Sequence, residues 1–246
     1  MTIQSATDLA ALQRAGNLVA RTLDAMRAAV RPGITTGALD SVGARFARAE
    51  GARSAPQLAY DFPGFTCFSV NDEIVHGIPG PRVLRAGDVV KLDVTLELDG
   101  YIADSAVTVL VPPATVPARD LQRCARQAFN AALRTARAGT RLADLGGAVE
   151  REVKRHGFAV VRELTGHGVG RRIHESPSVP NWPDPDVRGV LTPGLVIALE
   201  PMVTPRPTRA VEDRDGWTLR TRDGALAVHH EHTIVIRQGA ALVVTM

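Results

Sequence analysis

The stretch of the chain that most constrains its fold runs from 87 to 108 and reads GDVVKLDVTLELDGYIADSAVT. Apolar and β-branched residues lie on both sides of Asp99-Gly100, a dipeptide typical of the two-residue turn of a β-hairpin. With these two residues as the turn, Leu98 pairs with Tyr101, and the register of the hairpin follows from that pair. The sequence therefore predicts two long antiparallel strands.

This register brings acidic side chains together on one face of the hairpin. Thr95 faces Asp104, and Asp93 lies two residues from Thr95, so Asp93 is a diagonal neighbour of Asp104 on that face. Diagonal neighbours are roughly 7–8 Å apart, too far for one hydrogen bond, but both carboxylates can reach one cation between them. Acids among apolar strand residues are costly unless they are paired. The hairpin alone leaves two alternatives open, a metal site and a solvated sheet face.

The composition is that of an ordinary globular protein, with 246 residues of which 45% are hydrophobic and 22% charged. The first residues, MTIQSATDLA, have neither the basic nor the apolar segment of a secretory signal. No run approaches the roughly 18 apolar residues of a membrane span. Cys67 and Cys124 are the only cysteines and do not indicate a disulfide framework. We therefore expect a cytoplasmic protein with no membrane partner.

The chain is basic, with a formal net charge of +3 and a pI of about 9.3. A basic chain can bind nucleic acid. However, Lys91 and Lys154 are the only lysines, and the many arginines are interspersed with acids as on a normal protein surface. We therefore expect no specific nucleic-acid partner.

The remaining elements follow from hydrophobic periodicity. Residues 54–66 read as a loop, and the chain closes with a predicted hairpin between 218–221 and 225–236. Helices are expected over 7–30, 36–50, 117–138 and 142–156, and further strands over 67–76, 158–164 and 195–199.

Part of this pattern occurs twice. LQR at 12–14 recurs at 121–123, and GDVVKLD at 87–93 resembles GLVIALE at 194–200. The similar spacing predicts one domain, 1–246, made of two related halves at about 7–111 and 117–236. Halves packed about a pseudo-twofold axis would bring Asp93 and Glu200 to face each other across a shared cleft. The alternative is coincidence in an Ala- and Arg-rich chain.

Four carboxylates and one imidazole make up the candidate metal ligands. This hard, oxygen-rich donor set suits Mn²⁺, Fe²⁺ or Co²⁺ better than an ion that prefers thiolates. A single divalent ion cannot neutralise four acids, whereas two ions with two bridging carboxylates can, as in two-metal hydrolases. The five residues are Asp93, Asp104, His167, Glu200 and Glu231.

Two further histidines, His76 and His174, remain as candidates for donating to a substrate carbonyl or moving a proton. Each lies beside glycine or in a polar loop, although a lone histidine is more often structural.

These residues lie in motifs that resemble those of the type I methionine aminopeptidases, the short bacterial form of the pita-bread metallopeptidase family. The resemblance covers nearly the whole chain, and its motifs occur in the family's order. The matching segments are VRPGITTGAL (30–39), SVNDEIVHGIPG (69–80), the hairpin 87–108, TGHGVGRRIHESP (165–177), LEPM (199–202), DGWT (215–218) and EHT (231–233).

The resemblance implies an α+β pita-bread fold, with two pseudo-symmetric halves and a central curved antiparallel sheet flanked by helices. It implies removal of the N-terminal methionine from peptides and nascent chains when the second residue is small, by a cytoplasmic monomer that meets its substrates at the ribosome. The cofactors would be two divalent ions, Co, Mn, Fe(II) or Zn. Asp93 would hold one ion, His167 with Glu200 the other, and Asp104 with Glu231 would bridge both.

By the same resemblance, His174 would hydrogen-bond the substrate carbonyl, and His76 would contact the amide near the scissile bond. The segment around 59–67 departs from the family's usual pattern in length or alignment, so the pocket residues follow from it less directly than the metal ligands do. The residues expected around the methionine side chain are Tyr60, Phe62, Cys67 and Trp217.

Other departures concern the histidines before Glu231. His229 and His230 stand where the family usually has Gln and an aromatic residue. The two interpretations are imidazoles that perturb metal affinity beside a bridging ligand and surface residues, and we expect surface residues. Two alternative functions stay open. One is a proline-specific aminopeptidase or prolidase on the same fold, which usually carries an extra N-terminal domain. The other is a non-enzymatic binding protein, which typically loses metal ligands that this chain keeps.

Overall fold

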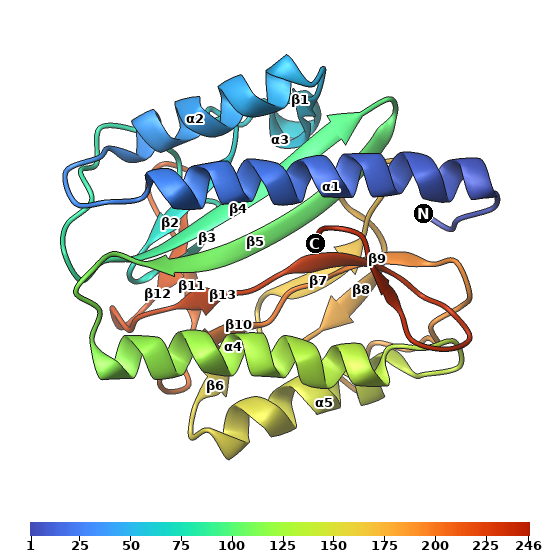
Figure 1. Ribbon diagram of the computed structural model, residues 1–246. Helices are drawn as coiled ribbons and strands as arrows, with labels where there is room; N and C mark the ends of the chain where they lie inside the picture. Colours follow the sequence, from blue (N-terminus) through green and yellow to red (C-terminus); the bar gives the residue numbers. More distant parts are fainter.

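The long hairpin is the centre of the computed structural model, which describes residues 1–246. Strands β4 (Val89–Leu98) and β5 (Tyr101–Leu110) pair antiparallel, with Leu98 opposite Tyr101. The predicted register is therefore confirmed. In Figure 1 the two strands, in green, run across the molecule and pass behind helix α1.

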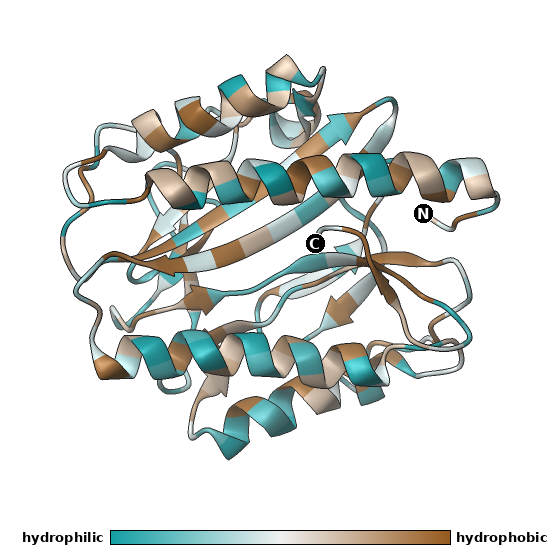
Figure 2. Ribbon diagram, in the orientation of Figure 1, coloured by the Kyte–Doolittle hydropathy of each residue, from teal (hydrophilic) through white to brown (hydrophobic).

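Two pairs of helices cover the strands. α1 (Ala6–Ala29) packs on β4 and β5 and against α2 (Thr36–Ala49), whereas α4 (Val116–Thr135) packs against α5 (Leu142–Arg155) on the opposite side of the molecule (Figure 1). Each pair lies over its own hydrophobic cluster. In Figure 2 hydrophobic and hydrophilic residues alternate along α1 and α4, as expected of helices with one buried face.

Short strands fill the space between the two helix pairs. β1 (Arg53–Ser54) and β2 (Cys67–Val70) both pair with β4, and a second sheet has the order β15-β14-β9-β7-β8. A third has the order β13-β10-β6 and a fourth β11-β12-β3. The bounds are β3 Glu73–Val75, β6 Ala159–Val160, β7 Thr165–Gly168, β8 Glu175–Pro180, β9 Val196–Leu199, β10 Met202–Thr204, β11 Ala210–Glu212, β12 Leu219–Thr221, β13 Val228–His229, β14 His232–Val235 and β15 Leu242–Val243.

Two local expectations are wrong. The segment 54–66 contains a helix, α3 (Ala55–Tyr60), whose first turn is capped by the side chain of Ser54. The predicted closing hairpin does not form, because β12 pairs with β3 and β11 instead of with the segment 225–236. None of the helices is both long and apolar enough to cross a membrane.

Candidate metal centre

One cavity of about 390 Å³ lies between the hairpin and the second sheet. All of the predicted site residues line this cavity, together with further side chains that were not among the predicted site residues. The predicted residues are Tyr60, Phe62, Cys67, His76, Asp93, Asp104, His167, His174, Glu200, Trp217 and Glu231, and the additional ones are Pro56, Val75, Thr95, Leu164, Thr165, Ile173, Met202 and His229.

The two acids of the hairpin enter the cavity from adjacent strands. Thr95 lies opposite Asp104, as predicted, and its hydroxyl donates a 2.8 Å hydrogen bond to Asp104 Oδ1. The backbone N–H of Asp104 donates to Thr233 Oγ1 over 2.9 Å, which ties β5 to β14. Asp93 lies two residues from Thr95 on the same strand, so its side chain shares the face that Asp104 occupies.

The second sheet supplies the other acids and the imidazole. Glu200 directly follows β9, and Glu231 lies between β13 and β14. The backbone N–H of Glu231 donates to the carbonyl of Ala106, and Ser105 donates its hydroxyl hydrogen to the carbonyl of Glu231, so this residue is held alongside β5. His167 lies on β7, next to β9. Strands from both sides therefore bring the acids into one cavity.

The four carboxylates crowd one another in a buried site. Asp104, Glu200 and Glu231 have exposed fractions of 6%, 6% and 2%. Burial, followed by the charge of neighbouring carboxylates, holds the pKa values of Asp93, Glu200 and Glu231 well above their usual range. Burial also raises the pKa of Asp104 to about 7, although hydrogen bonds from Thr95 and the Ser105 backbone oppose the shift. Such a group of acids ionises together only with cations nearby.

The tautomer of His167 fits a cation as well. Its Nδ1 lies 2.9 Å from the carbonyl oxygen of Gly168, which can only accept, so Nδ1 carries the proton. Burial lowers the pKa of His167 to about 4, and the ring is neutral at pH 7. Its Nε2 lone pair thus faces Glu200 Oε1 at 3.4 Å, and this buried oxygen has no hydrogen-bond partner. An imidazole nitrogen and a carboxylate oxygen that face each other in this way are suited to bind one cation between them.

Two neutral histidines stand beside the acids. His174 Nδ1 lies 2.7 Å from the hydroxyl of Tyr60, and its ring centroid lies 4.3 Å from that of His167. Burial, followed by the charge of His174, lowers the pKa of His76 to about 4, and burial also lowers the pKa of His174. His76 has a φ of +59°, a left-handed backbone that is uncommon outside glycine and often marks functional positions.

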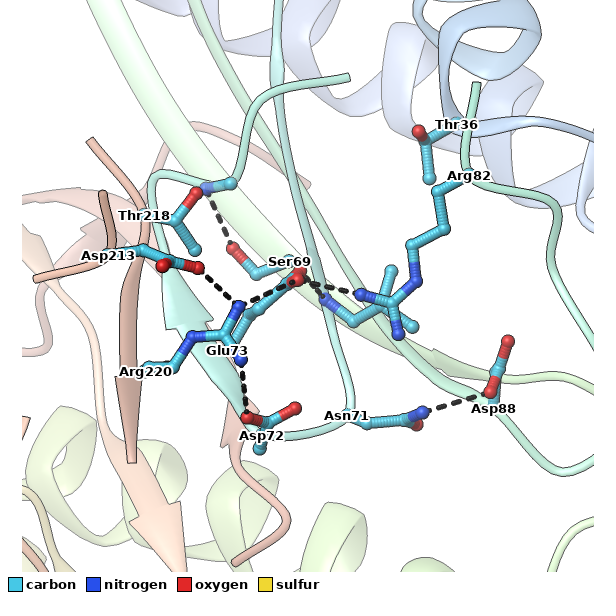
Figure 3. A network of polar contacts seen from close by, with 12 residues as sticks. Thr36, Ser69, Asn71, Asp72, Glu73, Arg82, Asp88, Asp213, Thr218 and Arg220 are labelled. Atoms are coloured by element: carbon cyan, nitrogen blue, oxygen red, sulfur yellow. Dashed lines mark hydrogen bonds and ion pairs between the residues drawn. The ribbon is translucent and has the colours of Figure 1, made fainter. Parts of the chain in front are cut away.

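Figure 3 shows a network of polar contacts around Arg220 and Glu73, in the segments next to His76 and Trp217. Arg220 on β12 pairs with Asp213, in the loop that leads to Trp217, and lies 3.7 Å from Glu73 on β3. β3 ends directly before His76, and it pairs with β12. The network therefore ties together the two segments that bring His76 and Trp217 to the cavity.

Aromatic side chains form part of the cavity lining. The rings of Phe62 and Trp217 meet edge to face with centroids 5.1 Å apart, and both line the cavity. Cys67 lies opposite Asp93 across β2 and β4 and has an exposed fraction of 6%. Tyr60 is 45% exposed and stands at the rim. The cavity thus combines a carboxylate cluster with an aromatic wall, which is formed by Phe62 and Trp217.

Comparison with known proteins decides the family. The model of "Metallopeptidase family M24" matches residues 10–238. The chain belongs to metallopeptidase family M24. It is 38% identical to methionine aminopeptidase 2 of Bacillus subtilis over 100% of this chain and 99% of that protein. The crystal structure of methionine aminopeptidase from Thermotoga maritima superposes with a TM-score of 0.95 at 34% identity, covering 100% of this chain and 99% of the other.

Proline-specific peptidases of known structure are more distant. The prolidase of Pyrococcus furiosus shares the fold with a TM-score of 0.81, but its identity is 19% and this chain covers 65% of it. The activity of the chain is therefore that of a methionyl aminopeptidase, a metal-dependent hydrolase that releases N-terminal methionine, and the pita-bread fold is confirmed. The prolidase and non-enzymatic alternatives are not supported.

One expectation about this M24 site is wrong. His229 is not a surface residue: it has an exposed fraction of 2% and lines the same cavity, and His230 is half-buried. The position of His229 at the end of β13, next to β10, encloses its side chain. Its proximity to Glu231 in the sequence was the only signal that could have indicated this.

Proposed function

We propose that five side chains of this methionine aminopeptidase hold two divalent ions. Asp93 binds one ion, His167 with Glu200 the other, and Asp104 with Glu231 bridge both. The raised pKa values of the buried carboxylates support this assignment, since two divalent cations neutralise four acids. Ions of this kind supply Lewis acidity at the scissile carbonyl and lower the pKa of a water.

The donor set supports particular metals. Four carboxylates and one imidazole, with Cys67 not ionised because burial raises the pKa of its thiol, favour Co, Mn, Fe(II) or Zn over ions that need thiolates. Glu200 Oε1 and Glu231 Oε1 are buried without a hydrogen-bond partner, and a bound cation would satisfy them.

His174 and His76 would orient the peptide. When the hydroxyl of Tyr60 donates to His174 Nδ1, the proton of that neutral ring lies on Nε2, which can donate to the substrate carbonyl and to the oxyanion that develops from it. His76 lines the same cavity and, being neutral, can hydrogen-bond the amide next to the scissile bond. Both act as donors that cost no reorganisation during the reaction.

The aromatic wall would receive the methionine side chain. The edge-to-face pair of Phe62 and Trp217, with Cys67 and Tyr60, offers a polarizable surface suited to a thioether. The free α-amine of the substrate would approach the acidic end of the cavity, which explains why only the first residue is removed. We propose that the second residue has to be small.

The substrates would be N-termini of peptides and nascent chains, met at the ribosome by a monomeric cytoplasmic enzyme. A comparison of Met-Ala-Ser, formyl-Met-Ala-Ser, Leu-Ala-Ser and Ala-Pro-Ser at equal metal tests the substrate preference. We expect rapid cleavage of the first, poor cleavage of Leu-Ala-Ser and none of the formylated peptide. Preference for Ala-Pro-Ser over Met-Ala-Ser would contradict the proposal.

We also propose that 7–111 and 117–236 are two related halves of one catalytic domain. Each contains a pair of helices over its own hydrophobic cluster, and each contributes an acid at or after a strand, Asp93 on β4 and Glu200 after β9. A superposition of the halves that puts these two acids at unrelated positions would overturn the idea.

A further inference from the structure

His229 is held in the metal cavity by its own backbone. Its N–H donates to Thr108 Oγ1 over 3.0 Å, and its carbonyl accepts from the same hydroxyl over 2.8 Å. These two bonds fix the end of β13 on β5, and the ring is enclosed, with an exposed fraction of 2% for the residue. The imidazole therefore has little freedom to leave the position in which the fold places it.

One nitrogen of the His229 ring faces the Oε2 atoms of two of the acids. Its Nε2 lies 3.4 Å from Glu200 Oε2 and 3.7 Å from Glu231 Oε2. Neither ring nitrogen has a hydrogen-bond partner, although both are buried. A buried N–H group without an acceptor is rare in native proteins, so these nearby oxygens are the natural acceptors for it.

The other oxygens of the same two acids have a different environment. Glu200 Oε1 and Glu231 Oε1 are buried and have no partner, and Glu200 Oε1 is the oxygen that faces His167 Nε2 at 3.4 Å. Each carboxylate thus has one oxygen toward His229 and another that no protein donor satisfies. The free Oε1 atoms are the ones left for a cation.

We propose that His229 is a positioning residue of the metal centre. Its Nε2–H donates to the Oε2 atoms of Glu200 and Glu231 and so presents their Oε1 atoms to the ions, an inference that rests on the proposed metal centre. His229 binds no ion itself. Hydrogen bonds to ligating carboxylates orient them, and their loss typically weakens metal affinity by about 10–100-fold.

The test compares variants that keep or remove the donor. His229→Leu removes the N–H group, and His229→Gln replaces it with an amide N–H. His230→Leu is the matched control, because His230 is the adjacent imidazole and packs against Phe129, with ring centroids 5.3 Å apart. Isothermal titration of each metal-free protein with Mn²⁺ gives the affinities, and thermal unfolding of the metal-free proteins verifies that each is folded.

We expect His229→Leu to bind Mn²⁺ about 10–100-fold more weakly, His229→Gln to recover most of the loss, and His230→Leu to bind as the wild type does. Spin-echo modulation of bound Mn²⁺ should detect one coordinated imidazole, that of His167, in the wild type and in His229→Gln. The spectra of the wild type and of His229→Gln remain decisive if His229→Leu does not fold.

Two results would overturn the proposal. One is unchanged Mn²⁺ affinity in a folded His229→Leu variant. The other is a second coordinated imidazole in the wild type that disappears in His229→Gln, which would make His229 a ligand. A wild-type protein that binds no Mn²⁺ would instead contradict the metal centre itself, so the two failures are distinguishable.

Discussion

Thr95 donates its hydroxyl hydrogen to Asp104 Oδ1 across the β4–β5 pair, over 2.8 Å. The bond is formed between two residues that face each other only because Asp99-Gly100 makes the turn of the hairpin. It leaves the other carboxylate oxygen, Asp104 Oδ2, at 3.9 Å from His167 Nε2. The hairpin therefore orients one acid of the cavity before any ion is bound.

Replacing this donor should weaken metal binding. Thr95→Val keeps the volume but removes the hydroxyl, so we expect affinity for the divalent ions to fall by about 10–100-fold, as is typical of lost hydrogen bonds to ligands. Thr95→Ser retains the hydroxyl and should bind nearly as the wild type does. Calorimetric titration of the metal-free proteins gives both values, and equal affinities for Val and Ser variants would contradict the role.

Removal of the acids should separate bridging from terminal ligands. Asp104→Ala should weaken the binding of both ions, whereas Asp93→Ala should mainly weaken that of one, and Glu200→Ala should abolish turnover. Each of these losses of metal affinity or activity should exceed the 10–100-fold that is typical when a group that hydrogen-bonds a metal ligand is removed. Metal analysis after dialysis gives the occupancy, and full occupancy of both sites in Asp104→Ala would rule out a bridging role for Asp104.

Asp104 should favour the folded state of the metal-free protein more strongly at pH 6 than at pH 8. Burial raises the pKa of Asp104 from 3.8 to about 7, so between these values the folded state binds more protons than the unfolded state. The contribution of Asp104 to the free energy of unfolding therefore decreases as the pH rises through 7, whereas buried histidines such as His76 and His167, whose pKa values are lowered to about 4, contribute with the opposite sign. Urea unfolding in chelator at pH 6 and pH 8 isolates this contribution: the free energy of unfolding at pH 6 minus that at pH 8 should be lower in Asp104→Asn than in the wild type, because the Asn side chain does not titrate.

His174 should matter for the rate more than for binding. His174→Ala removes a donor to the developing oxyanion, so kcat should fall by about 10²–10³-fold with a much smaller change in KM. Metal content should stay near that of the wild type, since the ring bonds Tyr60 and not the acids. If the purified variant loses its metal, His174 is a ligand and the donor role is wrong.

The sequence predicts the hairpin well because its signals are local. A two-residue turn sets the register of both strands, so the pairs Leu98–Tyr101 and Thr95–Asp104 follow from residues close in the chain. Motifs that resemble those of a known family predicted the fold and the activity. The α1 and α4 helices are also long enough for their apolar periodicity to be clear.

The parts that could not be predicted depend on distant contacts or on very short elements. Helix α3 has six residues, too few for a periodic pattern. Leu219 on β12 lies opposite Val75 on β3, more than 140 residues earlier in the chain. Nothing near Leu219 in the sequence indicates this partner. His229 was expected at the surface, and it is buried because its backbone bonds Thr108, 121 positions away.

The aromatic wall leads to a prediction about specificity. Trp217 meets Phe62 edge to face and lines the cavity, so Trp217→Ala removes one side of the surface proposed for the methionine side chain. Burial of a Met side chain contributes roughly 1.5–3 kcal/mol, so the wild type should prefer Met-Ala-Ser to Ala-Ala-Ser by about 10–200-fold in kcat/KM. In Trp217→Ala this preference should shrink several-fold, because kcat/KM falls for the Met peptide and changes little for the Ala peptide. Leu58→Ala, at an exposed position on α3 that does not line the cavity, serves as the control and should keep the wild-type ratio. An equal loss of activity on both peptides would show that Trp217 supports the catalytic arrangement and does not select the side chain.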